Sequence, residues 1–263
     1  MANIKSIVKV MNFQALLHVD KAHRTADKYL LLEKDVNKMI NIIENNKNLI
    51  LDKKFAKIDP NNPRLRIFIG SDLGFCGVIN ASVNRELLKE DGSNDIVIVG
   101  RKIHTDKPIK YEVSRDDFED KFSDITALFE DGIKNKRYSG VDIFYNHYHN
   151  MAQIEPMMRT IFPVESKKDD EDEDLFKDDF LIEGGDVEKI LQELTITYLN
   201  YELKSAIVSS YASENILRQQ ATNESLKHID ELEEQKRWAE HKMREKVAVS
   251  RVIESYTKLT FRE

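Results

Sequence analysis

"GSDLGFCGVIN", residues 70–80, holds three glycines and the single cysteine of the chain within eleven residues. It follows the strand-like run "RLRIFI" at 64–69 and leads into residues 78–90, where apolar side chains recur at helical spacing. A glycine-rich turn between a strand and a helix can cradle a phosphate, and Cys76, the single cysteine of the chain, could act as a nucleophile. The stretch therefore raises the question of a catalytic site.

The glycine spacing of this stretch does not match the phosphate-binding loops. A P-loop needs G-x-x-x-x-G-K-[ST], and here Gly77 is followed by Val78 instead of lysine. A dinucleotide-binding loop needs G-x-G-x-x-G, whereas the glycines stand at Gly70, Gly74 and Gly77. We therefore expect no nucleotide and no other cofactor at this turn.

Cys76 lacks a base that would activate it. The nearest histidine in the sequence is His104, and no acid–base pattern surrounds it. Single cysteines are more often buried packing residues than nucleophiles. We interpret the stretch as a packing turn, in which Asp72 caps backbone amides and Gly74 and Gly77 permit close approach of neighbouring groups. No catalytic residue is expected.

Outward from the turn, residues 64–164 read as one α/β domain. The runs "RLRIFIG", "NDIVIVG" and "GVDIFYN" are rich in β-branched and aromatic residues, and the segments between them have helical spacing. The apolar positions of these two helical segments are Ile79, Val83 and Leu87 in one, and Phe118, Phe122, Ile125 and Phe129 in the other. Strands that alternate with helices predict a mostly parallel, Rossmann-like sheet.

Both ends of the chain read as long amphipathic helices. Residues 1–58 contain no glycine or proline, and apolar or small residues recur there every three or four positions. The second helical region, 184–263, contains neither residue from Asp186 onward and has the same period. We expect the two helices to form a long antiparallel coiled coil beside the α/β domain.

The expected seam between these helices is poor in large apolar residues. Its members are Ala15, Ala22 and Ala26 on one side and Ser205, Ala212, Asn215, Gln219 and Thr222 on the other. Leucine-rich seams lock coiled coils together, and this seam is only partly apolar. Two interpretations stay open: a structural coiled coil whose exposed apolar side chains are tolerated, or a pair that a surrounding protein sleeve covers.

An acidic block separates the α/β domain from the second helix. Residues 165–183 include "ESKKDDEDEDLFKDDF", and like charges at this density repel one another and stay solvated. The block lacks the glycine and the ligand spacing of an EF-hand loop, which disfavours a calcium site. We expect a linker there.

The composition excludes several classes of protein. The net charge of −7 and the lack of a basic stripe disfavour nucleic acid as a partner. One cysteine excludes a disulfide framework and a cysteine-based metal site. No run of about 18 apolar residues occurs, so we expect no direct insertion into a membrane.

Three further residues draw attention. His147 and His149 share one face of an extended segment, but no third ligand lies nearby in the sequence, so we expect no metal site. Trp238 stands on the C-terminal helix, where an interface anchor is the favoured interpretation.

The glycine stretch also resembles a family motif. The gamma subunits of F-type ATP synthases carry S-T-D-x-G-L-C-G-x-x-N after their first strand, and the chain has Ser71, Asp72, Gly74, Cys76, Gly77 and Asn80 in the same order. Four more matches follow collinearly along the chain. They are Ile7, Val10, Asn12 and Gln14; Val99 and Gly100; "YNHYHN" (145–150) with Pro156 and "IFP" (161–163); and Ala212, Ser213, Glu214 and Arg218.

This resemblance implies a non-enzymatic subunit. In that family, the paired terminal helices insert into a hexamer of alternating alpha and beta ATPase subunits, one shaft per hexamer, and asymmetric contacts couple ATP turnover to rotation. Further partners implied are an epsilon-like subunit and a membrane-ring or adaptor protein. The implied location is cytoplasmic, peripheral to the cell membrane through the complex.

The helix segments that face the hexamer in the family depart from its pattern. The family's C-terminal R-Q-x-x-[IV]-T-x-E corresponds here to Arg244, Glu245, Ala248, Val249 and Arg251, so only the arginine is kept. The N-terminal K-I-T-K becomes "ALLH" at 15–18. The expected hexamer contacts are therefore Asn12, Gln14, Leu16, Arg244, Glu245, Val249 and Arg251. The departures make a specialised complex, such as a gliding motor, at least as well supported as an orthodox synthase. The alternative is a non-rotating coiled-coil adaptor that retains the gamma fold.

Overall fold

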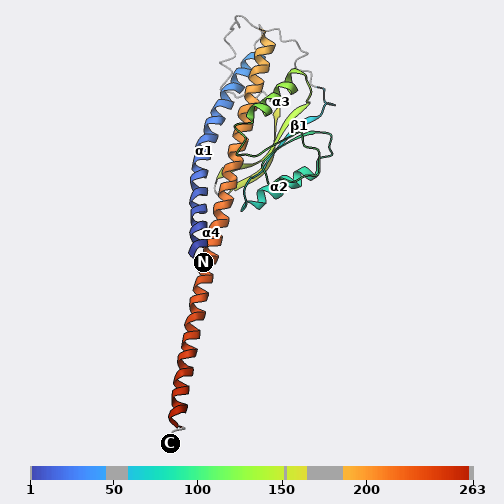
Figure 1. The fold of residues 1–263 in the computed structure, drawn as a ribbon. Coiled ribbons are helices and arrows are strands. Elements are labelled where there is room, and N and C mark those ends of the chain that lie inside the picture. Colours follow the sequence, from blue (N-terminus) through green and yellow to red (C-terminus); the bar gives the residue numbers. More distant parts are fainter. Residues whose placement is uncertain (1, 46–58, 151–152, 165–185, 261–263) are drawn as a thin grey trace. The chain divides into compact units, whose positions relative to one another are not determined.

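The computed structural model describes residues 2–45, 59–150, 153–164 and 186–260 (Figure 1). Two compact units make up the chain: Ala15–Arg218 is one, and Met1–Gln14 with Gln219–Glu263 is the other. The elements, in order, are α1 (Ala2–Asn45), β1 (Arg64–Ile69), α2 (Gly77–Leu88), β2 (Asp95–Val99), β3 (Tyr111–Val113), α3 (Phe122–Lys134), β4 (Gly140–Asn150), β5 (Gln153–Phe162) and α4 (Val187–Thr260).

The unit Ala15–Arg218 contains one five-stranded sheet in the order β3-β2-β1-β4-β5. The pairs β1–β2, β1–β4 and β2–β3 are parallel, and β5 runs antiparallel to β4. The predicted α/β class and mostly parallel sheet are thus confirmed. Two strands were not predicted, because β3 has three residues and β5 mixes exposed and buried positions around Pro156.

Helices cover both faces of this sheet (Figure 1). On one face, Val83 and Leu87 of α2 pack on Phe68, Ile98 and Phe144 of the strands. The other face carries the larger core, in which α3, the second half of α1 and the first half of α4 bury their apolar side chains. The predicted apolar faces of the two domain helices are confirmed at Ile79, Val83, Leu87, Ile125 and Phe129, which are buried. Phe122, the first residue of α3, is half-buried against the same core, and Phe118 is buried but precedes the helix.

The helix pair of this unit is antiparallel and closely packed. The ring centroids of His18 and Tyr211 are 5.5 Å apart, and those of Tyr29 and Tyr201 are 6.5 Å apart. The residue number increases along α1 while that of its partner on α4 decreases, as in an antiparallel pair. The predicted small seam is confirmed here by four buried residues. They are Ala15, Ala22, Ala212 and Asn215.

The second unit, Met1–Gln14 with Gln219–Glu263, packs the first part of α1 against the later part of α4. Asn12 donates its side-chain amide to the Gln219 carbonyl at 3.1 Å and to the Thr222 hydroxyl at 2.9 Å. Lys5 forms ion pairs with Asp230 and Glu233. Beyond these contacts, every described side chain of residues 234–255 is exposed. We call residues 234–255 the exposed helix segment.

Several predicted boundaries lie outside the described residues. The structure does not describe residues 46–58 of the predicted N-terminal helix, nor the predicted linker at 165–183. The C-terminal helix predicted at 184–263 is described as Val187–Thr260. Within the described ranges, no helix has the length and apolar character needed to cross a bilayer.

Candidate functional site

The glycine turn buries its cysteine. Cys76 is 2% exposed, and its thiol donates toward the Ser71 hydroxyl at 3.2 Å and the Leu73 carbonyl at 3.1 Å. Burial raises the pKa of the thiol, so it stays protonated at neutral pH. A buried, protonated thiol that faces a hydroxyl and a carbonyl is a packing residue, as the sequence predicted.

Hydrogen bonds fix the conformation of the turn. The Asn80 side chain accepts from the Ser71 backbone N–H at 3.0 Å and donates to the Ser71 hydroxyl at 2.7 Å. Asp72 accepts the backbone N–H of Arg101 at 2.8 Å and that of Asp116 at 3.3 Å. The prediction that Asp72 caps backbone amides is confirmed, and those amides belong to the loops after β2 and β3 instead of to α2.

The expected close approach at Gly74 and Gly77 was wrong. A Cβ atom on either glycine would meet nothing within 4 Å. The close approach occurs where β1 and β2 end: a Cβ on Gly70 would meet the Ile103 side chain at 2.7 Å, and Gly100, at φ +126°, would meet the Gly70 carbonyl carbon at 3.0 Å. The turn thus requires glycine at its strand end and tolerates side chains at its helix end.

The histidine pair lies on β4 beside α4. The rings of His147 and His149 are 4.4 Å apart, and His149 lies 3.6 Å from the Glu155 carboxylate. His147 contacts the hydroxyls of Tyr145 and Ser209, each at 3.3 Å. Across the described ranges, no three or more His, Cys, Asp or Glu side chains converge as metal ligands would.

The exposed helix segment concentrates large apolar side chains in water. Trp238 is 69% exposed and Met243 is 65% exposed. The other exposed apolar residues of the segment are Val247, Val249, Val252 and Ile253. An apolar surface of this kind on a soluble helix marks a site of protein association.

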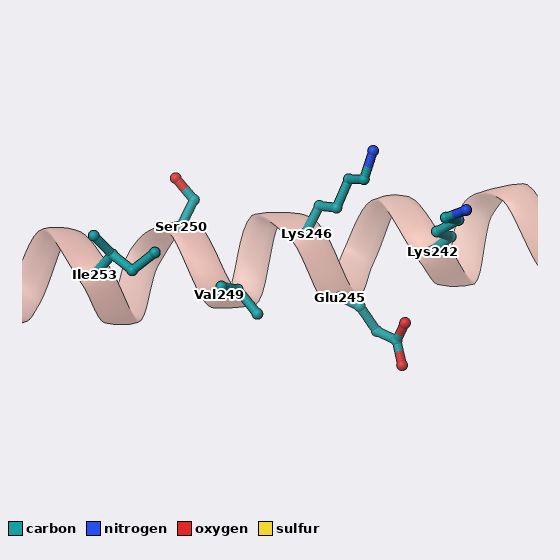
Figure 2. Close-up of a pocket in the computed structure, with 6 residues that line it drawn as sticks. All are labelled: Lys242, Glu245, Lys246, Val249, Ser250 and Ile253. Atoms are coloured by element: carbon teal, nitrogen blue, oxygen red, sulfur yellow. The ribbon is translucent and has the colours of Figure 1, made fainter.

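The segment is also basic, although the chain as a whole is acidic. Residues 234–255 hold six lysines and arginines and four glutamates, against a net charge of −7 for the chain. Figure 2 shows six of its residues, all on one helix, with Lys246 and Ser250 on one edge and Glu245 on the opposite edge. The apolar and charged groups are interleaved around the helix, so a partner must contact it from more than one side.

The predicted hexamer contacts fall into two groups. Arg244, Glu245, Val249 and Arg251 lie in the exposed helix segment. On α1, Gln14 and Leu16 are exposed. The Asn12 side-chain amide, in contrast, donates hydrogen bonds to Gln219 and Thr222 of α4, so it joins α1 to α4 within the chain.

Two buried charge clusters were not predicted from the sequence. In the first, Glu214 of α4 is 1% exposed and accepts from Arg115, in the loop after β3, and from Arg218, one turn along α4. The Arg115 guanidinium also stacks 4.2 Å from the centre of the Tyr211 ring. The second cluster surrounds Glu202 of α4. Glu214 and Arg218 stood out in the sequence only through the family match, and Glu202 only as a glutamate within an otherwise apolar or small helix face.

Comparisons with known proteins agree over nearly the whole chain. The family model described as ATP synthase matches residues 1–249. The gamma chain of ATP synthase from Wolbachia pipientis subsp. Culex pipiens is 25% identical over 267 residues, covering 88% of this chain and 86% of that protein. The gamma chain from Mycoplasma mobile is 25% identical over 249 residues, covering 88% and 84%.

Solved structures share the fold. A chain from the central stalk and c-ring structure of the Tetrahymena thermophila mitochondrial ATP synthase aligns with a TM-score of 0.57 at 18% identity, over 83% of this chain and 99% of that one. A chain from the Euglena gracilis mitochondrial ATP synthase aligns with a TM-score of 0.53 at 16% identity, over 92% and 93%. Together with the packing turn and the paired helices, the family model and the gamma-chain relatives place this chain in the ATP synthase gamma-chain family, as a non-catalytic subunit.

Proposed function

We propose that the chain is the central rotor shaft of an F-type-like ATPase. It inserts its terminal helices into a hexamer of alternating alpha- and beta-type ATPase subunits, one shaft per hexamer. Asymmetric contacts then bias each catalytic subunit between its conformations, because a ligand shifts an equilibrium only through unequal contacts with the two states. The complex carries the chain to the cytoplasmic face of the cell membrane.

The exposed helix segment is the observation that carries this proposal. Twenty-two residues of helix extend about 33 Å, and an isolated helix without tertiary packing is marginally stable in water. Exposed apolar side chains from Trp238 to Ile253 lower the free energy of any complex that buries them. A sleeve that encloses the helix meets this requirement, whereas a partner on one face leaves part of the apolar surface in water.

The departures from the family motif favour a specialised complex. Glu245 stands where the family has glutamine, and Arg251 stands where it has a carboxylate. A sleeve that fits this helix therefore needs altered charges opposite both positions. A gliding motor is one such complex, and an epsilon-like subunit, a membrane ring or an adaptor completes it at the α/β domain.

Co-purification distinguishes the shaft from a non-rotating coiled-coil adaptor. The tagged full chain, isolated from its own cell and weighed by native mass spectrometry, is expected to bring down a hexamer of Walker-motif ATPase subunits with one copy of the chain. Recovery of the chain with partners that bind no nucleotide would support the adaptor and contradict the shaft.

Replacing Cys76 with serine tests the packing role of the turn. We expect the complex to keep its ATPase activity within about twofold, because the buried thiol contacts a hydroxyl and carbonyls that a serine hydroxyl also satisfies. Steady-state ATP hydrolysis by the purified complex is the measurement, with native mass spectrometry as the control for assembly. Abolished hydrolysis in a normally assembled complex would restore the catalytic interpretation of Cys76.

A further inference from the structure

Glu202 of α4 lies in a buried cluster formed by four elements of the unit Ala15–Arg218. It is 1% exposed, and it forms an ion pair with Arg159 of β5 at 2.7 Å. Tyr198, one turn earlier on α4, donates its hydroxyl to Glu202 at 2.8 Å. Glu33 of α1 lies 3.4 Å from the same guanidinium nitrogen of Arg159. Tyr145 of β4, which interacts with Arg159, completes the cluster.

The charges of this cluster do not balance when all its groups are ionised. Two carboxylates, Glu33 and Glu202, share one guanidinium, so a net negative charge is left in a site with little water. The remaining neighbours add no positive charge: Tyr145 and Tyr198 keep their protons, since burial raises both pKa values, and burial lowers the pKa of His147. Removing an unpaired charge from water is costly, and carboxyl pairs of this kind bind a proton.

Protonation of one carboxyl resolves the imbalance. Burial, opposed by Arg159 and assisted by the nearby Glu33 carboxylate, raises the pKa of Glu202 to about 7. The Glu33 and Glu202 carboxylates contact the same guanidinium nitrogen of Arg159, at 3.4 Å and 2.7 Å, so the charge of Glu33 favours a proton on Glu202. When α1 leaves the cluster, Glu202 loses this neighbour and gains water, and its affinity for the proton falls.

We propose that the cluster is a proton-linked latch that holds α1 against α4 and β5 while Glu202 carries a proton beside Glu33 and Arg159, and that loosens when Glu202 is ionised. The latch joins the two helices of the pair to the sheet, because its members come from α1, β4, β5 and α4. It works within this chain alone and does not depend on the shaft function.

The direction of the pH effect follows from the proton count. The closed state binds one proton more than the open state between about pH 4.5, the ordinary value for glutamate, and about pH 7. The closed state is therefore fully favoured below that window and weakens as pH rises through it. The opening constant of α1 is expected to rise by up to about tenfold per pH unit there and to level off above pH 7.

Hydrogen exchange of the full chain measures this opening directly. Peptides from residues 25–43 of α1 report the latch, and peptides from α2, which lies on the other face of the sheet, serve as the internal reference. After correction for intrinsic exchange, the opening constant of the α1 peptides is expected to increase between pH 5.5 and 7.5 by at least tenfold more than that of the α2 peptides.

Two variants test the assignment of the proton. Glu202→Gln keeps a hydrogen-bonding group of the same size without a charge, so it is expected to remove the pH dependence and to lower the opening constant at pH 8. Glu33→Gln, at a more exposed site of the cluster, is expected to remove most of the pH dependence, because Arg159 then neutralises Glu202 by itself. An unchanged pH dependence in both variants, or faster opening of Glu202→Gln at pH 8, would overturn the proposal.

Discussion

Glu214→Gln is expected to lower the free energy of unfolding by about 3–5 kcal/mol, the usual cost of breaking a buried ion pair from one side. Glu214 is 1% exposed and is held between Arg115 and Arg218. A glutamine would leave two guanidiniums with no carboxylate between them, and the buried amide cannot neutralise either. Urea unfolding of the full chain at pH 7.5, followed by circular dichroism, measures the loss.

Glu130→Gln is the matched control for this variant. Glu130 pairs with Lys134 at 2.9 Å on an exposed face of α3, and exposed pairs at this spacing contribute about 0.3–0.5 kcal/mol. A loss below about 1 kcal/mol for Glu214→Gln, equal to that of the control, would show that the Arg115 contact does not hold α4 to the α/β domain.

The second large effect is expected from the exposed helix segment. Among the side chains that the structure describes, removal of residues 244–263 deletes four large, exposed apolar ones: Val247, Val249, Val252 and Ile253. Burial of such side chains contributes about 1.5–3 kcal/mol each, so their loss is expected to weaken association with the hexamer by 100-fold or more. The stability of the α/β domain is expected to stay unchanged, since these residues lie outside its core. Titration of the truncated chain into a hexamer preparation that lacks this subunit measures the change.

A pair of point variants on the same helix sharpens this experiment. Val249→Asp places a charge where the sleeve is expected to be apolar, and Ser250→Asp adds the same charge at the next residue, on another edge of the helix (Figure 2). We expect Val249→Asp to weaken association at least tenfold more than Ser250→Asp. Equal effects of the two variants would mean that the segment contributes only charge to the association.

The long helices and the central sheet could be predicted because their patterns are regular over many residues. Periodic apolar positions identified both terminal helices and α2, and β-branched runs identified β1, β2 and β4. The short strand β3 and the mixed strand β5 carry no such pattern, because each lies at an edge of the sheet and only part of it is buried.

The roles of single residues in the turn depend on which strands lie next to each other, and the sequence does not give the order of the strands in the sheet. Gly70 and Gly100 are close because β1 and β2 are adjacent, and neither glycine stands out in the sequence from Gly74 or Gly77. Cys76 could be predicted as a packing residue because the sequence near it contains no activating base, and this prediction did not depend on the order of the strands.

The buried clusters were missed for the same reason. Glu202 and Glu214 interrupt a helix face, but the arginines that join them to the sheet domain are distant in the sequence: Arg159 precedes Glu202 by 43 residues and Arg115 precedes Glu214 by 99. The predicted anchor role of Trp238 stays a prediction, and its exposure leaves the ring accessible to a partner.

Rotation of a probe on the α/β domain shows whether the chain turns inside the hexamer. Asp106, an exposed loop residue, is replaced by cysteine in a Cys76→Ser chain, so that one thiol carries a bead while the purified hexamer is fixed to a surface. The shaft account predicts that the bead turns in one direction when ATP is added and stops when ATP is removed. A bead that stays still while the same complexes hydrolyse ATP would contradict it.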